Sequence, residues 1–279
     1  MMLEVKNLSI FFTENQESQE VAHQVSFAVR QGEIVGLVGE SGSGKTITAL
    51  TIAGLRKKDQ VIKEGQIFLD GVDLLGLDST KMRKVQGKEI GFIFQEPMSA
   101  LNPTMKIGHQ VEEALRIHTS LGKKERKERV IQALHDVELD EAEALYDKYP
   151  HELSGGMRQR VMIAAAMICR PKLLIADEPT TALDVGTQAA ILQLLKKLNE
   201  KHGMSILFIS HNLRVVKELC GWIAVMQHGE IIEQGKADDI FGNPQKEYTK
   251  ALLAAIPPTV EESLREMIFP AISSFSRIK

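Results

Sequence analysis

The chain has 279 residues, of which 43% are apolar and 25% are charged, and its formal net charge is -3. This length can bury a sizeable core, as one α/β unit or two subdomains, and the composition excludes fibrous and disordered proteins. A dedicated nucleic-acid-binding protein usually presents a strongly basic face, which this charge balance does not favour. We therefore expect a folded protein with no nucleic acid among its partners.

The sequence predicts no membrane span and no secretion signal. Its longest apolar run, Val161–Cys169, is about half of the ~20 residues that a membrane-spanning helix needs. The N-terminus enters a strand-like pattern at once, without the successive sections of a signal peptide. Cys169 and Cys220 are too few for a disulfide framework, and we expect both to be buried thiols. These features predict a soluble cytoplasmic protein.

Short β-rich runs open the chain and predict an N-terminal antiparallel β-region. They are Leu3–Val5, Ser9–Phe12, Val25–Val29 and Gln66–Leu69. Four apolar runs of strand length lie between and after them: Ile34–Val38, Ile90–Phe94, Leu173–Ala176 and Ile206–Ile209. Because these four are continuously apolar, they predict strands covered on both faces, as in a parallel sheet with flanking helices.

Each of the four apolar runs leads directly into a polar or glycine-rich feature. In order, these are a glycine-rich loop, Gln95, the pair Asp177 and Glu178, and the pair Ser210 and His211. In an open α/β sheet, ligands bind outside the carboxyl ends of the strands. The sequence therefore predicts one nucleotide site built from four strand ends.

The middle of the chain has a charged, helical pattern. We predict a helical subdomain over about residues 97–155, inserted in an α/β core that spans residues 1–256, with 257–279 as a short C-terminal tail. Its charge-dense run Lys123–Arg129 is most simply a solvated helix face, and a partner-docking face is the alternative.

The glycine-rich loop has the pattern of a phosphate-binding loop. It consists of Gly39, Glu40, Ser41, Gly42, Ser43, Gly44, Lys45 and Thr46. Its backbone N–H groups can cradle phosphates at the start of a helix, which we expect to end near Gly54. Lys45 supplies a charge to the β- and γ-phosphates of ATP, and the Thr46 hydroxyl is a Mg²⁺ ligand.

Two carboxylates end the predicted strand Leu173–Ala176. Asp177 is placed to hold Mg²⁺ through water, and Glu178 to polarise the attacking water. A solvated turn is the alternative, but the phosphate loop upstream favours the catalytic interpretation.

A second glycine pair follows a predicted helix cap. The segment consists of Leu153, Ser154, Gly155, Gly156, Met157, Arg158 and Gln159. Ser154 is placed as the N-cap of a helix that stops before Pro171, and the two glycines after it expose N–H groups that form a second anion site. Since one chain cannot readily supply two phosphate cradles to one nucleotide, we expect two chains to pair head to tail, each segment closing on the other's ATP.

With these motifs in this order, the sequence resembles the ATP-binding-cassette (ABC) ATPase family across nearly the whole chain. The resemblance implies an ABC-type α/β fold and a competent ATPase. It implies that Gln95 contacts Mg²⁺ or water and links the site to a permease, and that His211 contacts the γ-phosphate. The segment Leu153–Gln159 is then the family signature, and Glu178 the catalytic carboxylate.

The same resemblance implies two further roles. Asp184, in the segment Thr181–Asp184, organises the interface between the two ATPase chains. Phe12 aligns with the aromatic residue that stacks on adenine, with Phe11 as the competing candidate and a core strand position as the plain alternative.

More narrowly, the chain resembles the peptide and nickel importer branch. The residues that carry this are Phe94–Pro103, Tyr149–Glu152 and Tyr248–Leu253. Many peptide-importing members carry a Cys-containing extension after the last segment. No cysteine follows Cys220 here, which argues against an iron–sulfur site and favours a nickel, metallophore or short peptide member.

The branch implies several partners at the cytoplasmic face of a prokaryotic membrane. They are an integral permease, a second ATPase subunit that is a related chain or a second copy, and, indirectly, an extracytoplasmic substrate-binding protein. The alternative is a non-transport cassette ATPase acting on nucleic acid or ribosomes. Such proteins need long coiled coils, zinc cysteines or two cassettes in one chain, which this sequence does not contain.

Overall fold

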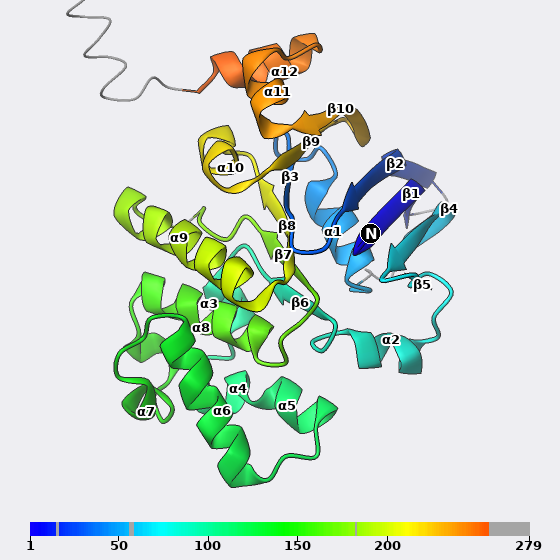
Figure 1. Cartoon of the computed structure of the whole chain (residues 1–279). Helices are drawn as coiled ribbons and strands as arrows, with labels where there is room; N and C mark the ends of the chain where they lie inside the picture. Colours follow the sequence, from blue (N-terminus) through cyan, green and yellow to red (C-terminus); the bar gives the residue numbers. More distant parts are fainter. Residues whose placement is uncertain (15–16, 56–58, 182, 257–279) are drawn as a thin grey trace, which may run out of the picture.

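Two β-sheets organise the fold (Figure 1), and the computed structural model describes residues 1–14, 17–55, 59–181 and 183–256. The first sheet, of order β2-β1-β4-β5, is antiparallel and contains β1 (Leu3–Glu14), β2 (Glu17–Val29), β4 (Gln60–Leu69) and β5 (Val72–Asp73). The second, of order β10-β9-β3-β8-β7-β6, contains β3 (Ile34–Val38), β6 (Ile90–Ile93), β7 (Leu173–Asp177), β8 (Ser205–Ser210), β9 (Trp222–Gln227) and β10 (Glu230–Lys236). The predicted tail, residues 257–279, lies outside the described residues.

The second sheet confirms the predicted parallel strands. β3, β8, β7 and β6 pair in parallel, as β9 does with β3, and only β10 runs antiparallel within this sheet. The predicted β-rich runs Leu3–Val5 and Ser9–Phe12 are both strand, and they form parts of the single strand β1, which contains bulges. β2 and β4 also begin earlier than predicted, since their outer ends are largely exposed and lack an apolar pattern.

Alternating side chains of the second sheet build two separate cores. Val35 and Leu37 pack with the antiparallel sheet and α1 (Lys45–Ile52) on one face. Ile34 and Val38 point to the opposite face and join the helical core. Because successive side chains of a strand point to opposite faces, a continuously apolar strand serves both cores.

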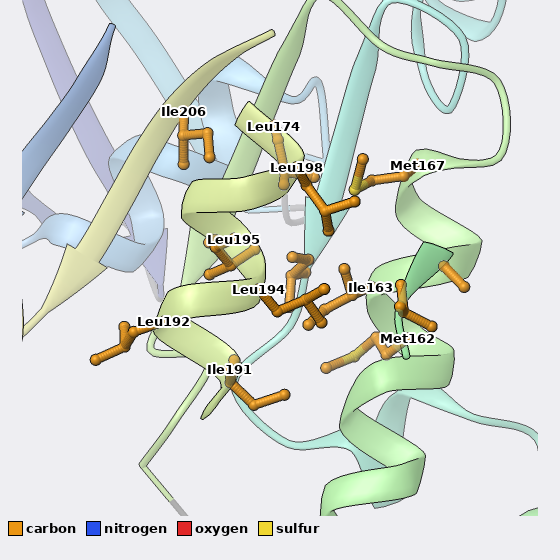
Figure 2. Packing of buried hydrophobic residues seen from close by; sticks show 14 of the residues in the cluster. Met162, Ile163, Met167, Leu174, Ile191, Leu192, Leu194, Leu195, Leu198 and Ile206 are labelled. Atoms are coloured by element: carbon orange, nitrogen blue, oxygen red, sulfur yellow. The ribbon is translucent and has the colours of Figure 1, made fainter. Parts of the chain in front are cut away.

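The helical core lies between the sheet and two long helices, α8 (Gly155–Met167) and α9 (Val185–His202). Figure 2 shows Leu194 and Leu198 of α9 facing Ile163 of α8, with Leu174 and Ile206 of the sheet above them in this view. All five side chains are at most 2% exposed. This packing fixes the start of α8 beside the start of α9.

The region between β6 and α8 is helical, as the sequence predicts. It contains α3 (Pro97–Ala100), α4 (Ile107–Val111), α5 (Glu113–His118), α6 (Lys123–Asp136), α7 (Ala142–Leu145) and a 3₁₀ turn at Pro150–Glu152. α6 exposes most of Lys123–Arg129 and buries Val130 and Leu134, so the charged run lies on an exposed helix face. The boundaries of an inserted subdomain stay a prediction.

The remaining helices surround the two sheets. They are α2 (Ser79–Val85), α10 (Leu213–Leu219), α11 (Ala237–Gly242) and α12 (Glu247–Ala254). Within the described part of the chain, no helix is long and apolar enough to cross a membrane. Cys220 is buried as predicted, whereas Cys169 is only partly buried.

Candidate functional site

The phosphate loop joins β3 to α1, and its tight packing requires glycine. Gly44 has a φ of +103°, and a Cβ atom there would lie 2.7 Å from the carbonyl oxygen of Val21 in β2. A Cβ atom at Gly39 would run into the carbonyl oxygen of Met226 in β9. The backbone of both sheets therefore shapes the loop, and only glycine fits at these two positions. α1 ends at Ile52, just before Gly54, in agreement with the predicted stop.

Lys45 lies beneath the loop and is only 4% exposed. Its ammonium group donates to the carbonyl oxygens of Gly39 at 2.8 Å and Glu40 at 2.7 Å, and to the Ser43 hydroxyl at 3.3 Å. Burial lowers the pKa of Lys45, against the opposing pull of the Glu178 and Asp177 carboxylates. A buried cation held by the loop carbonyls is well placed to attract an anion into the loop.

Asp177 ends β7 beside the start of α1. Its Oδ1 accepts a hydrogen bond from the Thr46 hydroxyl at 3.1 Å. Burial raises the pKa of Asp177 to about 6, and the neighbouring Glu178 adds to the rise while Thr46 and Lys45 oppose it. A carboxylate that is costly to ionise, beside a hydroxyl oxygen, fits a divalent cation that prefers oxygen ligands. The residues present thus suit Mg²⁺.

Glu178 is the centre of the polar cluster. Its Oε2 accepts hydrogen bonds from the Gln95 amide at 3.2 Å and from the Thr181 hydroxyl at 2.9 Å. Its Oε1 lies 3.0 Å from Nδ1 of His211, whose side chain is 48% exposed. The structure therefore brings together the three predicted catalytic residues, Glu178, His211 and Gln95, which come from three different strand ends.

The backbone of Glu178 is also unusual. Its φ of +46° lies in the left-handed region, which is costly for a residue other than glycine, and its N–H donates to the carbonyl of Ile209 in β8 at 3.0 Å. Neither this strain nor the bond from Thr181 is predicted from the sequence. The segment Thr181–Asp184 is a sequence motif, but no local pattern shows that the Thr181 hydroxyl turns back to Glu178.

The signature segment lies at the start of α8. Ser154 caps this helix, as predicted, by accepting from the Met157 N–H at 3.3 Å. A Cβ atom at Gly156 would lie 2.9 Å from the Thr187 side chain of α9, so this glycine allows α8 and α9 to approach. Asp184 caps α9 through bonds of 3.0 and 2.7 Å from the N–H and hydroxyl of Thr187.

The signature residues differ in exposure. Ser154 is exposed, and Gly155, Gly156, Met157 and Arg158 are partly exposed. Leu153 and Gln159, by contrast, are buried at 4% and 1% exposure. Their side chains have interior positions in this chain, which does not suit the predicted direct contact with a nucleotide on another chain.

The register of β1 distinguishes Phe11 from Phe12. Phe12 lies opposite Gln60, whose amide donates to the Thr51 hydroxyl of α1 at 2.6 Å, so this face of the sheet is turned toward α1. Phe11 has the ammonium group of Lys63 3.9 Å from its ring centre. Since neighbouring residues of a strand point to opposite faces, Phe12 is the aromatic residue on the side of the phosphate loop and α1.

The model of the ABC transporter family matches residues 22–181, more than half of the chain. The chain belongs to the ABC transporter family. Among its relatives, the dipeptide transport ATP-binding protein DppD of Haemophilus influenzae is 46% identical over 264 residues, which cover 95% of this chain and 80% of that protein. The oligopeptide transport ATP-binding protein AppD of Bacillus subtilis is 47% identical over 257 residues, 92% of this chain and 78% of that protein.

Solved ABC structures share the fold. A dimeric post-hydrolysis state of an ATP-binding cassette bound to ADP and Pi matches with a TM-score of 0.76 and 32% identity, covering 85% of this chain and 99% of that chain. The cbiO1 protein of Clostridium perfringens, part of the ABC transporter complex cbiONQ, matches with a TM-score of 0.75 and 25% identity, covering 99% of both chains. This ABC transporter chain is an ATP-binding ATPase with the predicted α/β cassette fold.

The buried carboxylate of Asp177 predicts a pH-dependent stability. Because folding raises the pKa of Asp177 to about 6, its ionised form costs stability above that pH, and the cost fades as the pH falls toward the unfolded value. We expect Asp177→Asn to stabilise the nucleotide-free protein at pH 7.5 by roughly 2–3 kcal/mol, and by much less at pH 4.5. Thermal melting at both pH values measures the difference.

Asp184→Asn is the matched control. Hydrogen bonds from Thr187 hold the pKa of this exposed carboxyl below its usual range, so removing its charge is not expected to raise the melting temperature. An Asp177→Asn protein that melts at or below the wild-type temperature at pH 7.5 would contradict the assigned burial cost.

Proposed function

We propose that this chain is the ATP-hydrolysing subunit that energises import of peptides through a separate membrane permease. The observation that carries the catalytic part is the Glu178 carboxylate, which is bonded to Gln95 and Thr181 and paired with His211. The cargo is inferred from the relatives, whose printed functions are dipeptide and oligopeptide transport.

In the proposed reaction, ATP lies with its phosphates on the loop above Lys45 and its adenine on Phe12. Glu178 accepts a hydrogen bond from the attacking water, and His211 orients toward the γ-phosphate. Mg²⁺, when held by Thr46, Gln95 and Asp177, would neutralise phosphate charge.

A second ATPase chain, related or identical, completes the proposed site. The exposed Ser154 and the neighbouring N–H groups of Gly155 and Gly156 begin the 13-residue helix α8, and they would meet the γ-phosphate bound to the other chain. The exposed Asp184 lies at the start of the adjacent α9 and would belong to the same interface.

Glu178→Gln tests the catalytic assignment. Glutamine keeps the size of the side chain and can still meet Thr181 and His211, but it is a poor proton acceptor. We expect the variant to bind ATP and hold a closed dimer while turnover falls by about 10²–10⁴-fold. Phosphate-release kinetics and size-exclusion chromatography with ATP measure both effects.

The control is Glu128→Gln, which makes the same change on the exposed face of α6. It should leave turnover unchanged. Normal ATP turnover by the Glu178→Gln protein would refute the assigned role.

An apolar groove beside Gln95 suits the permease. The groove has a volume of about 380 Å³ and lies between the core and the helical region, where it is lined by Leu55, Phe94, Ile117 and Met162 among others. Phe94 and Ile117 are 39% and 67% exposed, which is high for large apolar side chains. Phe94 directly precedes Gln95, so a permease helix in this groove would contact the strand end that carries the Glu178 partner.

This docking would hold the chain at the cytoplasmic face of a bacterial membrane. The extracytoplasmic substrate-binding protein would act on it only through the permease.

Ile117→Asp tests this groove. A charge there should weaken docking of an apolar helix, because burying an unpaired carboxylate is costly. We expect the isolated variant to hydrolyse ATP like wild type but to lose stimulation by the permease, and to be recovered with it at a yield lowered by about tenfold or more. Val72→Asp, at an exposed position of β5, is the control that should assemble normally.

The cargo requires a transport experiment in source cells. We expect a chromosomal Glu178→Gln variant to lose uptake of a labelled dipeptide or oligopeptide and to retain uptake of labelled Ni²⁺. Loss of Ni²⁺ uptake alone would favour the nickel or metallophore importer that the sequence leaves open. Unchanged uptake of both would count against the peptide assignment.

A further inference from the structure

Helix α12 is anchored at the edge of the six-stranded sheet (Figure 1). The carboxylate of Glu233 in β10 accepts the N–H groups of Gln245 at 2.7 Å and Lys246 at 3.2 Å, just before the helix begins. Burial opposes ionisation, yet these hydrogen bonds keep the pKa of Glu233 below its usual value. Thr249 in the first turn of α12 is 1% exposed. The start of α12 is therefore held in a fixed place.

This anchoring brings one side chain of α12 to the phosphate loop. The hydroxyl oxygen of Tyr248 accepts a hydrogen bond from the backbone N–H of Glu40 at 3.0 Å, across 208 positions of sequence. The Glu40 N–H belongs to the same peptide unit as the Gly39 carbonyl, which accepts from the Lys45 ammonium at 2.8 Å.

The N–H and C=O of a trans peptide point in opposite directions. Tyr248 and Lys45 thus hold the Gly39–Glu40 peptide unit from its two sides.

Holding the Gly39–Glu40 peptide unit in place matters because the backbone of Gly39 has a positive φ. Its φ is +153°, and glycine can leave such a conformation at little steric cost. If the peptide unit turned, the Gly39 carbonyl would no longer face Lys45, and the ammonium would lose one of the acceptors that hold it beneath the loop. The hydrogen bond from the Glu40 N–H to the Tyr248 hydroxyl opposes that rotation of the peptide unit.

The far end of α12 reaches the other side of the site. Leu252 of α12 and the two residues that follow the helix, Ala255 and Ile256, line a cavity of about 340 Å³ together with the segment 211–214, which begins with His211. α12 therefore contacts the phosphate loop at its start, and its end faces the His211 segment across this cavity.

We propose that Tyr248 is a positioning residue for ATP binding, whose hydroxyl fixes the Gly39–Glu40 peptide unit so that Lys45 is held ready for the phosphates. The inference rests on the proposed ATP-binding function and deepens it. In the sequence, the Tyr248–Leu253 segment only indicates a resemblance to the peptide and nickel importer branch. The proposal assigns its first residue a role in the nucleotide site.

The test is Tyr248→Phe, which removes one oxygen atom and keeps the ring. We expect the dissociation constants of the full chain for Mg²⁺–ATP and Mg²⁺–ADP to rise together by about three- to tenfold, as for the loss of one hydrogen bond. The affinity for adenosine should stay unchanged, because adenosine has no phosphate to meet the loop. In ATPase assays the KM should rise by the same factor and kcat should stay within about twofold.

Two controls separate a positioning role of Tyr248 from a role in general stability. Tyr149→Phe removes the same atom from a tyrosine whose ring stacks on His151, and this variant should bind ATP like wild type. Tyr248→Phe should melt within about 2 °C of wild type without nucleotide.

Glu233→Ala is a second test, because it loosens the start of α12. This variant should also raise the dissociation constant for ATP.

The outcomes are distinct. Wild-type affinity for ATP in Tyr248→Phe would overturn the proposal, as would a loss seen only in Tyr248→Ala, which would indicate ring packing instead. An equal loss of affinity for adenosine would also overturn it. Failure of the wild-type chain to bind ATP would contradict the proposed function itself, and with it this inference.

Discussion

Parallel pairing of β3, β8, β7 and β6 is the constraint on which the site depends. It brings four carboxyl strand ends to one edge of the sheet, so that Lys45, Glu178, His211 and Gln95 meet although they are far apart in sequence. The pairing requires strands that are buried on both faces, and the two cores of the molecule satisfy this condition. The apolar strands therefore determine both the position of the site and which polar residues lie in it.

The nucleotide site contains buried ionisable side chains. Lys45 and Asp177 are both at most 4% exposed, and burial shifts the pKa of each toward its neutral form. The left-handed backbone of Glu178 adds strain beside them. Strained residues and buried charges are common where a ligand offsets their cost, which agrees with a nucleotide-binding site.

Neighbouring residues link this site to two proposed partner surfaces and to helix α12. Gln95 joins Glu178 to the apolar groove proposed for the permease, and the caps at Ser154 and Asp184 place two helix starts side by side for the proposed ATPase partner. α12 adds a contact from the C-terminal part of the chain through Tyr248. The links through Gln95 and Tyr248 are single hydrogen bonds, and those at Ser154 and Asp184 are helix caps.

The amino-acid sequence predicts the features that neighbouring residues create. The phosphate loop, the Ser154 cap, the carboxylate pair at the end of β7 and the buried strands all follow from residues adjacent in the chain, whose spacing dictates local backbone and burial. The direct contacts between distant residues, such as the hydrogen bond from Thr46 to Asp177 across 131 positions, depend on the three-dimensional fold. The reason is that strand order and register decide which side chains meet, and neither is written in a local pattern.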